Sequence, residues 1–506
     1  MNNTPADALS SSNPTTPARQ SPTQIRRSPA PITILGVPFD SVTTAETLAL
    51  IGDMIASRQP HYLATANVDF IVQALTDPEL RRILFDAHLV LCDGTPILWA
   101  SRWLGNPLPE RVTGSDLVPQ LLAEGERKGW RVFFFGGTEA SVAKAAANVR
   151  EKHPRLQLVG AYSPPFTSLL EMDHADVLRR IRAAQPDVLL VALGCPKQEK
   201  WIRMQYQAAG VPVSIGVGAT IDFLAGIVSR APVWMQRSGL EWMYRLGQEP
   251  RRLYRRYATD LRIFGWEIFQ QWRQLRARPA PKPGAAAVPT LTDPPQILKL
   301  PAHLDAAAVQ QAEVTWQQAL AAGTDLFVDL SATDFIDSTG VGLLARLQKK
   351  QRAAGRLLLL VAPTPPVQRA LQLMRLTDLL PAAATFAAAQ AMVTARLVER
   401  TLPVAADLAG GCETLHWYGE ITEANAAAIW EKSEAHLRQW EGRVPAVTID
   451  LSGLRFLDST GVSVMVRARK FGQRHGLKIQ FTTPTEVVRQ VIKLLRLEEF
   501  LFGSSQ

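Results

Sequence analysis

The C-terminal part of the chain contains the same sequence element twice. Residues 326–342 read LFVDLSATDFIDSTGVG, and residues 447–463 read VTIDLSGLRFLDSTGVS, so the two copies start 121 residues apart. A period of that length corresponds to a whole domain and not to the 20–50 residues of a solenoid repeat. The sequence therefore predicts two tandem α/β domains, over residues 296–398 and 412–503.

Short apolar runs alternate with helical patterns between residues 31 and 231. Five of these runs predict buried strands: His61–Thr65, Leu89–Cys92, Arg131–Phe135, Val188–Leu193 and Val213–Val217. Their alternation with amphipathic stretches predicts a Rossmann-like α/β domain with a largely parallel sheet. Because ligands of such sheets bind at the carboxyl ends of the strands, polar motifs that follow these runs are candidate site residues.

The remaining segments differ in composition. Residues 1–30 are rich in Ser, Pro and Thr and predict a disordered tail, and residues 279–295 predict a linker. Residues 232–278 predict a helical appendage with a break at Pro250. Between residues 237 and 278 there are ten Arg and four acidic residues, in a chain whose formal net charge is +9. Such a basic stretch indicates an anionic partner: phosphate, lipid headgroups or nucleic acid.

Aromatic residues interleave with these arginines. The mixture suits a lipid headgroup interface, and it also suits single-stranded nucleic acid or a domain-closing helix pair with a solvated basic face. No base-reading motif accompanies the arginines, so we expect no nucleic-acid partner. No apolar run reaches the ~20 residues that span a bilayer, so any membrane contact is expected to be peripheral.

The three cysteines, Cys92, Cys195 and Cys412, are widely separated and odd in number. They form neither a disulfide framework nor a zinc-ligand spacing, which fits a reducing cytoplasm.

Asp93 and its neighbours form the first candidate site. Asp93 ends a predicted strand beside Gly94, where a carboxylate can act as a general base, although an Asp-Gly pair is more often a turn or a cap. Thr65 and Asn67 follow the preceding predicted strand. Arg111 can hold a phosphate with two hydrogen bonds, its alternative being a surface ion pair.

Two further polar residues, Lys197 and Gln198, lie between a predicted strand and a helix. They are candidates for contact with a sugar or a diphosphate, and the alternative is a solvated first helical turn.

In their order and spacing, these motifs resemble the WecG/TagA/CpsF family, glycosyltransferase family 26, over about residues 32–260. The most specific stretch comprises Gly194-x-Pro-Lys-Gln-Glu-x-Trp201, Gly216-Val-Gly-Ala-x-x-Asp222, Arg230-Ala-Pro-x-Trp234, Gly239-Leu-Glu-Trp-x-x-Arg-Leu246 and Glu249-Pro-x-Arg-Leu253. The resemblance implies an inverting, metal-independent enzyme. Such enzymes move a sugar, typically N-acetylmannosamine or its uronic acid, from a UDP-sugar to an undecaprenyl-diphosphate-linked sugar.

The resemblance also implies residue roles. Asp93 is the expected general base, Thr65 and Asn67 contact a sugar, and Arg111 and Gln198 hold the donor diphosphate. The remaining candidates for substrate binding are Lys197, Gly194, Gly136 and Gly137. For the membrane and the lipid diphosphate, the candidates are Arg245, Arg252 and Arg255. No Asp-x-Asp pair occurs in the sequence, so neither a metal nor another cofactor is expected. Cys92 departs from the family pattern, in which a small residue such as Ala precedes the Asp-Gly pair.

The repeated element resembles the STAS domain of anti-sigma-factor antagonists. That resemblance implies that a partner kinase phosphorylates the serine after the aspartate, here Ser338 and Ser459, and that an anti-sigma or kinase-like protein binds the domain. The alternative is that Asp337 and Asp458 with their serines are simple helix N-caps.

The sequence thus predicts a glycosyltransferase of surface polysaccharide or teichoic-acid-like synthesis. We expect it in the cytoplasm, peripherally bound to the inner face of the plasma membrane, with STAS-like domains that regulate it or bind a partner. Two alternatives stay open: a hexosyl (glucosyl) transferase of exopolysaccharide synthesis, and a partner-switching regulator whose transferase domain is inactive.

Overall fold

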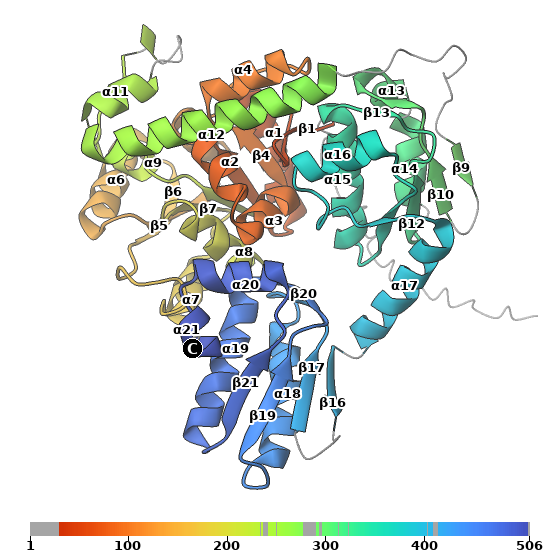
Figure 1. The fold of residues 1–506 in the computed structure, drawn as a ribbon. Coiled ribbons are helices and arrows are strands. Elements are labelled where there is room, and N and C mark those ends of the chain that lie inside the picture. Colours follow the sequence, from red (N-terminus) through yellow and green to blue (C-terminus); the bar gives the residue numbers. More distant parts are fainter. Residues whose placement is uncertain are drawn as a thin grey trace, which may run out of the picture.

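A computed structural model describes residues 30–232, 234–235, 241–248, 250–276, 290–292, 296–311, 313–321, 323–401, 403–407 and 413–503. These residues form an N-terminal domain with a helical appendage and two repeat domains, which both lie against the N-terminal domain (Figure 1). Nearly all of the predicted tail, most of the predicted linker and Cys412 lie outside the described residues.

The N-terminal domain contains a parallel sheet of six strands in the order β4-β3-β8-β7-β5-β6. The strands are β3 (His61–Ala66), β4 (Leu89–Cys92), β5 (Arg131–Gly136), β6 (Gln157–Tyr162), β7 (Val188–Ala192) and β8 (Val213–Gly216). The five predicted strands are present, which confirms the predicted fold class. The sixth, β6, was missed because Gly160 interrupts its short apolar run, and its residues are exposed or half-buried at the edge of the sheet.

Helices cover both faces of this sheet. Alternate residues of β5 show why: Val132 and Phe134 belong to one hydrophobic cluster, and Phe133 and Phe135 belong to another. The first cluster also contains side chains of α1 (Thr44–Ser57), α5 (Gly114–Lys128), α6 (Glu139–Lys152) and α9 (Thr220–Leu224). The second contains side chains of α2 (Val68–Ala74), α3 (Pro78–Asp86), α4 (Thr95–Trp103), α7 (His174–Ala184) and α8 (Lys197–Ala209).

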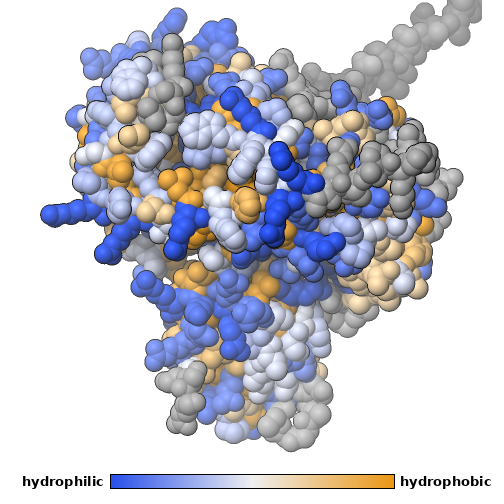
Figure 2. Space-filling model, turned by 45° about the horizontal axis from the view of Figure 1, so that its top comes forward, coloured by the Kyte–Doolittle hydropathy of each residue, from blue (hydrophilic) through white to orange (hydrophobic). Residues whose placement is uncertain are grey.

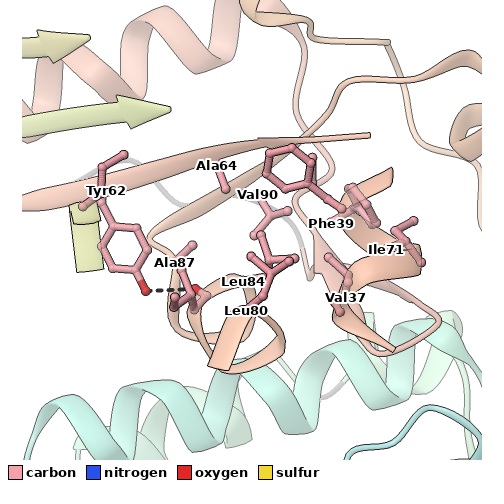
Figure 3. Packing of buried hydrophobic residues seen from close by; sticks show 14 of the residues in the cluster. Val37, Phe39, Tyr62, Ala64, Ile71, Leu80, Leu84, Ala87 and Val90 are labelled. Atoms are coloured by element: carbon pink, nitrogen blue, oxygen red, sulfur yellow. Dashed lines mark hydrogen bonds between the residues drawn. The ribbon is translucent and has the colours of Figure 1, made fainter. Parts of the chain in front are cut away.

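A short hairpin, β1 (Ile32–Ile34) and β2 (Val37–Phe39), extends the second cluster. Figure 3 shows Val37 and Phe39 of the hairpin packed near Leu80 and Leu84 of α3. The Tyr62 hydroxyl donates a hydrogen bond to the carbonyl of Ile83, at 2.9 Å, and so satisfies its polar end inside this apolar region.

The described part of the appendage includes α11 (Glu241–Gln248) and the long α12 (Pro250–Arg276), and α12 begins at Pro250, where the sequence predicted a break. In Figure 1, α12 runs across the N-terminal domain from α11 toward the first repeat domain. Phe264 and Ile268 anchor it in the cluster that also contains α2 and α8.

The two repeat domains have the same central arrangement, which confirms the predicted tandem copies. In the first, β10 (Gln296–Lys299), β12 (Leu326–Asp329), β14 (Leu358–Val361) and β15 (Ala382–Ala383) are parallel, and β9 (Thr290–Thr292) joins antiparallel. In the second, β17 (Glu413–Trp417), β19 (Ala446–Asp450) and β21 (Lys478–Thr482) are parallel, and β16 (Val404–Asp407) joins antiparallel. Both sheets therefore begin earlier in the chain than the predicted first residues of these domains, 296 and 412.

Smaller elements complete these domains. The first contains β11 (His303–Leu304), α13 (Ala306–Gln311), α14 (Glu313–Ala321), β13 (Phe335–Ile336), α15 (Ser338–Ala353), α16 (Pro365–Leu373) and α17 (Phe386–Thr401). The second contains β18 (Gly419–Ile421), α18 (Ala426–Trp440), β20 (Leu454–Leu457), α19 (Ser459–Arg474), α20 (Glu486–Leu494) and α21 (Glu498–Phe502). The repeated Asp-Ser-Thr-Gly segment forms the start of α15 and of α19.

Candidate active site

Two adjoining cavities lie at the carboxyl ends of the central strands. The larger has a volume of about 400 Å³ and lies between α4 and the appendage, and the smaller, of about 320 Å³, lies among the starts of α2, α8 and α9. Five residues line both cavities: Asn67, Asp69, Asp93, Ser115 and Arg256. The place of the cavities agrees with the binding edge expected for a parallel sheet.

Asp93 lies at the junction of the two cavities. It follows β4 directly, and its backbone N–H donates to the carbonyl of Ala66 at 2.9 Å, which fixes the backbone beside β3. Its Oδ2 accepts a long hydrogen bond, 3.5 Å, from the backbone N–H of Gly114, the first residue of α5. A carboxylate in this position can accept a proton from a hydroxyl group that enters either cavity.

Thr65 and Asn67 come from the neighbouring strand end. The Thr65 hydroxyl is buried and donates to the carbonyl of Gly216 at 2.9 Å, and Thr65 lines the smaller cavity. Asn67 caps α2 by accepting the N–H of Phe70 at 3.2 Å. The structure therefore brings Thr65, Asn67 and Asp93 together, as the order of the motifs predicted.

Arg111 lines the larger cavity, but it is already paired. Its guanidinium lies 3.4 Å from Glu241 Oε2 and 3.5 Å from Asp116 Oδ2. Arg230 approaches the same two carboxylates, at 2.7 Å from Asp116 and 3.8 Å from Glu241. The cluster joins α5 to α11. The binding of a diphosphate by Arg111 stays a prediction.

Gln198 lies at the start of α8 and is fully buried at the wall of the smaller cavity. Its Oε1 accepts the N–H of Gly218 at 3.2 Å, and its Nε2 donates to Glu199 Oε1 at 2.6 Å. Burial raises the pKa of Glu199 to about 7, and the hydrogen bond from Gln198 opposes this rise. Gly194 lines the same cavity with a positive φ of 77°.

Lys197 points elsewhere. Its ammonium group donates to the carbonyl of Thr167 at 2.5 Å, and Lys197 is not among the described residues that line either cavity. Its contact with substrate stays a prediction.

Gly136 ends β5 and Gly137 follows it, both beside the end of the neighbouring strand β7, and they lie outside the described lining of both cavities. A Cβ on Gly136 would lie 2.5 Å from the carbonyl oxygen of Ala192, and Gly137 donates its N–H to the same oxygen at 2.7 Å. Close packing against Ala192 is therefore a sufficient reason for Gly136, and a positive φ of 79° is one for Gly137. Their role in binding substrate stays a prediction.

The appendage contributes Arg256, which the sequence did not single out. Its guanidinium lies 3.8 Å from Asp69 and 4.0 Å from Asp260, and burial, with the charge of Asp69, raises the pKa of Asp260 to about 6. Helical spacing is a signal that could have identified Arg256, because it shares one face of the helix with Leu253, Asp260 and Phe264.

The predicted arginines of the appendage are placed differently. Arg255 is exposed and is not among the described lining residues, and the side chains of Arg245 and Arg252 lie outside the described part of the chain.

The aspartates of both repeated segments are helix N-caps. Asp337 Oδ1 accepts the N–H groups of Thr339 and Gly340 at 2.8 Å, and Asp458 Oδ1 accepts the corresponding pair at 2.9 Å. Ser338 and Ser459 follow these caps and are fully buried. Their phosphorylation stays a prediction.

Within the described ranges, no group of three or more His, Cys, Asp or Glu side chains is arranged to hold a metal ion. No helix of the described part is both long and apolar enough to cross a membrane.

Comparison with protein-family models gives three matches. Residues 32–278 match the glycosyl transferase WecG/TagA/CpsF family, residues 287–389 match the STAS domain, and residues 404–502 match the "Mlab, STAS domain" model. A solved structure of the anti-sigma factor antagonist SpoIIAA in its unphosphorylated form covers 20% of this chain and 89% of its own, with 20% identity and a TM-score of 0.17.

Two relatives share one name, N-acetylglucosaminyldiphosphoundecaprenol N-acetyl-beta-D-mannosaminyltransferase. The relative from Bacillus spizizenii is 34% identical over 191 residues, which are 38% of this chain and 72% of the relative. The relative from Staphylococcus aureus is 27% identical over 253 residues, which are 50% of this chain and 97% of the relative.

Proposed function

Because the chain belongs to the WecG/TagA/CpsF family of glycosyltransferases, we propose that it transfers an N-acetylmannosamine-type sugar from a UDP-sugar to an undecaprenyl-diphosphate-linked sugar, with inversion. These matches confirm three predictions made from the sequence: the family, the glycosyltransferase class and the two STAS domains. The acceptor and the transferred sugar are those in the relatives' name. That this chain uses them, and that its donor is a UDP-sugar, is the proposal.

The observation that supports the proposal best is the position of Asp93 where the two cavities meet. In the proposed reaction, the donor spans the junction of the two cavities, with its nucleotide in the smaller one and its diphosphate toward Arg111, and the acceptor hydroxyl enters from the larger one. Asp93 accepts the hydroxyl proton as the acceptor oxygen bonds to the anomeric carbon. The bond from that carbon to the diphosphate breaks on the opposite face, which inverts the configuration.

The departing UDP carries negative charge away from the anomeric carbon. Among the described residues, Arg111 and Arg256 bring guanidinium groups to the cavity walls, and the N-terminal residues of α5 and α8 lie close by. Fixed donors of this kind stabilise charge that develops in the transition state. Arg111 would exchange its carboxylate partners for the diphosphate.

The surface around the larger cavity supports a lipid-borne acceptor. Trp99, Trp242 and Leu261 line this cavity and are also exposed to solvent. Further exposed aromatic side chains lie nearby on α4 and α12: Trp103, Tyr254, Trp266 and Phe269. Figure 2 brings the upper face of Figure 1 forward and shows hydrophobic and strongly hydrophilic side chains intermixed on it.

Exposed aromatic residues beside arginines suit the headgroup region of an anionic bilayer. We therefore propose peripheral binding of the appendage face to the inner, cytoplasmic face of the plasma membrane. The larger cavity would then open toward the bilayer that carries the acceptor.

UDP release by the full-length protein tests this function. The assay uses UDP-N-acetylmannosamine and UDP-glucose as alternative donors, with a short-chain lipid-diphosphate N-acetylglucosamine as acceptor. We expect turnover with the acetylated donor and a loss of about 10²–10⁴-fold in Asp93→Asn. The control is Glu151→Gln, which changes an exposed carboxylate on α6 outside both cavities.

Each rival result has a defined meaning. Turnover with UDP-glucose alone would favour the hexosyltransferase of exopolysaccharide synthesis. Absence of turnover with any donor would favour a partner-switching regulator, and wild-type turnover by Asp93→Asn would remove the proposed base.

A further inference from the structure

The serine of the second repeat domain is enclosed by the N-terminal domain of its own chain. Ser459 donates its backbone N–H to Glu79 Oε1 at 2.7 Å and its hydroxyl to Glu79 Oε2 at 2.9 Å. Ser459 is 0% exposed and Glu79 is 1% exposed. Lys200 of α8 lies 2.9 Å from the same carboxylate and balances its charge. The start of α19 is therefore fully occupied.

The serine of the first repeat domain is enclosed in the same way by a different element. Gln271 of α12 donates from Nε2 to the Ser338 hydroxyl at 3.1 Å and to the carbonyl of Thr33 at 3.2 Å. Its Oε1 accepts the N–H of Leu35 at 3.1 Å. One buried glutamine thus ties the appendage, the β1–β2 hairpin and the repeat domain together.

Close backbone contacts support a specific fit in the first repeat domain. A Cβ added to Gly342 of α15 would lie 1.8 Å from the carbonyl oxygen of Pro31, and one added to Gly36 would lie 2.2 Å from that of Met374. Phe85 of α3 is 1% exposed and belongs to the hydrophobic cluster of this repeat domain. Packing of this closeness is typical of a domain interior.

Helix α3 contacts both repeat domains. On one side Asp86 forms an ion pair with Arg352 at 2.9 Å, and on the other side Arg82 forms one with Glu420 at 2.6 Å. Figure 1 shows α3 above the second repeat domain and beside the first. The N-terminal domain therefore presents one surface to both copies.

We propose that the faces centred on Ser338 and Ser459 are docking surfaces for the N-terminal domain of the same chain, and that this docking holds α12 and α8 in place around the cavities. An external protein that binds either serine face must first displace the N-terminal domain. The effect on activity rests on the proposed function, because α12 carries Arg256 and α8 carries Gln198, two residues of the cavity lining. The docking itself does not depend on it.

The first test uses hydrogen–deuterium exchange of the full-length protein carrying Gly342→Ala. Alanine suits the interior of α15, but its Cβ would collide with the Pro31 carbonyl. We expect exchange in β1 and at the start of α15 to rise about tenfold or more, while the strands of the repeat domain keep their protection. Unchanged exchange at β1 would overturn the docking of this face.

The matched control is Ser463→Ala, at the equivalent position of α19. Ser463 donates its hydroxyl to the carbonyl of Ser459, inside its own helix. We expect exchange in this variant to match that of the wild-type protein, and a rise at β1 in the control as well would overturn the specific role of Gly342.

The second test places a charge at the other face. Ser459→Asp sets a carboxylate against Glu79 and Asp458, and we expect faster exchange in α3 and α8, whereas Ser459→Ala keeps the backbone hydrogen bond and the wild-type pattern. Adding Glu79→Gln to Ser459→Asp removes the repulsion from Glu79, and we expect it to restore part of the protection. Wild-type exchange in Ser459→Asp, or no rescue by Glu79→Gln, would overturn the role of this contact.

UDP release by the same variants separates the two proposals. We expect release to fall by about tenfold or more wherever docking is lost. Loss of docking with unchanged release would overturn the link to the cavities. Absence of release from the wild-type protein, with the exchange results as expected, would refute the proposed function and leave the docking inference standing.

Discussion

The two repeat domains start their central helices with the same Asp-Ser-Thr-Gly segment, but the N-terminal domain meets them with different chemistry. Ser338 contacts a neutral amide, Gln271, whereas Ser459 contacts a carboxylate, Glu79, with a lysine behind it. Both copies continue with Val after this segment, and the next residue differs. It is Gly342 in the first copy, against the backbone of Pro31, and Ser463 in the second. The shared segment therefore fixes the start of the helix, and the residues opposite it decide what holds each domain.

The difference predicts that the charged contact is more costly to break than the neutral one. Lys200→Met leaves Glu79 and Asp77 buried without their shared cation, since Lys200 lies 2.9 and 2.8 Å from them. We expect a loss of about 3–5 kcal/mol in the free energy of opening the second interface. Hydrogen exchange of α3 amides measures this free energy of opening. If Lys200→Met lowers it by less than the loss of the Gln271 contact does at the first interface, the comparison is reversed.

Breaking the neutral contact should have a smaller effect. Gln271→Met removes the hydrogen bonds to Ser338, Thr33 and Leu35 but leaves no buried charge. We expect a loss of about 1–3 kcal/mol in the free energy of opening the first interface, measured at β1 and α15. The second interface serves as the control in the same sample and should keep its protection.

The smallest expected effect is a pH dependence of the charged contact. Burial, and then the charge of Glu79, raises the pKa of Asp458 to about 7, with Glu423 adding to the rise and Arg203 opposing it. A raised carboxyl pKa means that the docked form binds the proton more tightly, so docking strengthens as the pH falls through 7 and weakens as it rises. From pH 8 to pH 6 we expect a gain of about 1 kcal/mol.

Exchange at the second interface, corrected for the intrinsic pH dependence of amide exchange, measures this gain. Asp458→Asn keeps an oxygen to cap α19 but cannot ionise, so its interface should show no such slope. A slope retained in the variant would assign the titration to another group.

Much of the fold follows from local sequence. The five predicted strands, the edge strand β4 among them, have continuous apolar runs because both faces of the sheet are covered there, and the caps at Asp337 and Asp458 follow from residue type alone. The strand-end motifs placed Thr65, Asn67 and Asp93 together because parallel strands end at one edge of the sheet.

Long-range pairings could not be predicted in this way. One partner of Arg111 is Glu241, which lies 130 residues later in the chain, and Ser459 contacts Glu79, which lies 380 positions before it. Arg255 and Arg256 are neighbours on α12, but only Arg256 of the two lines the cavities. Which of them faces the cavities depends on how α12 packs against the N-terminal domain. Sequence patterns predict which side chains can form ion pairs, and tertiary structure selects the partner.

The unbroken length of α12 has a mechanical consequence. Its 27 residues, at a rise of about 1.5 Å each, make a rod of about 40 Å. Gln271 lies near the C-terminal end of this rod, and Arg256 lies 15 residues closer to the other end, about 22 Å along the axis. A tilt of about 5° about Gln271 would shift Arg256 by about 2 Å, enough to break a hydrogen bond, with no relay of side-chain movements in between.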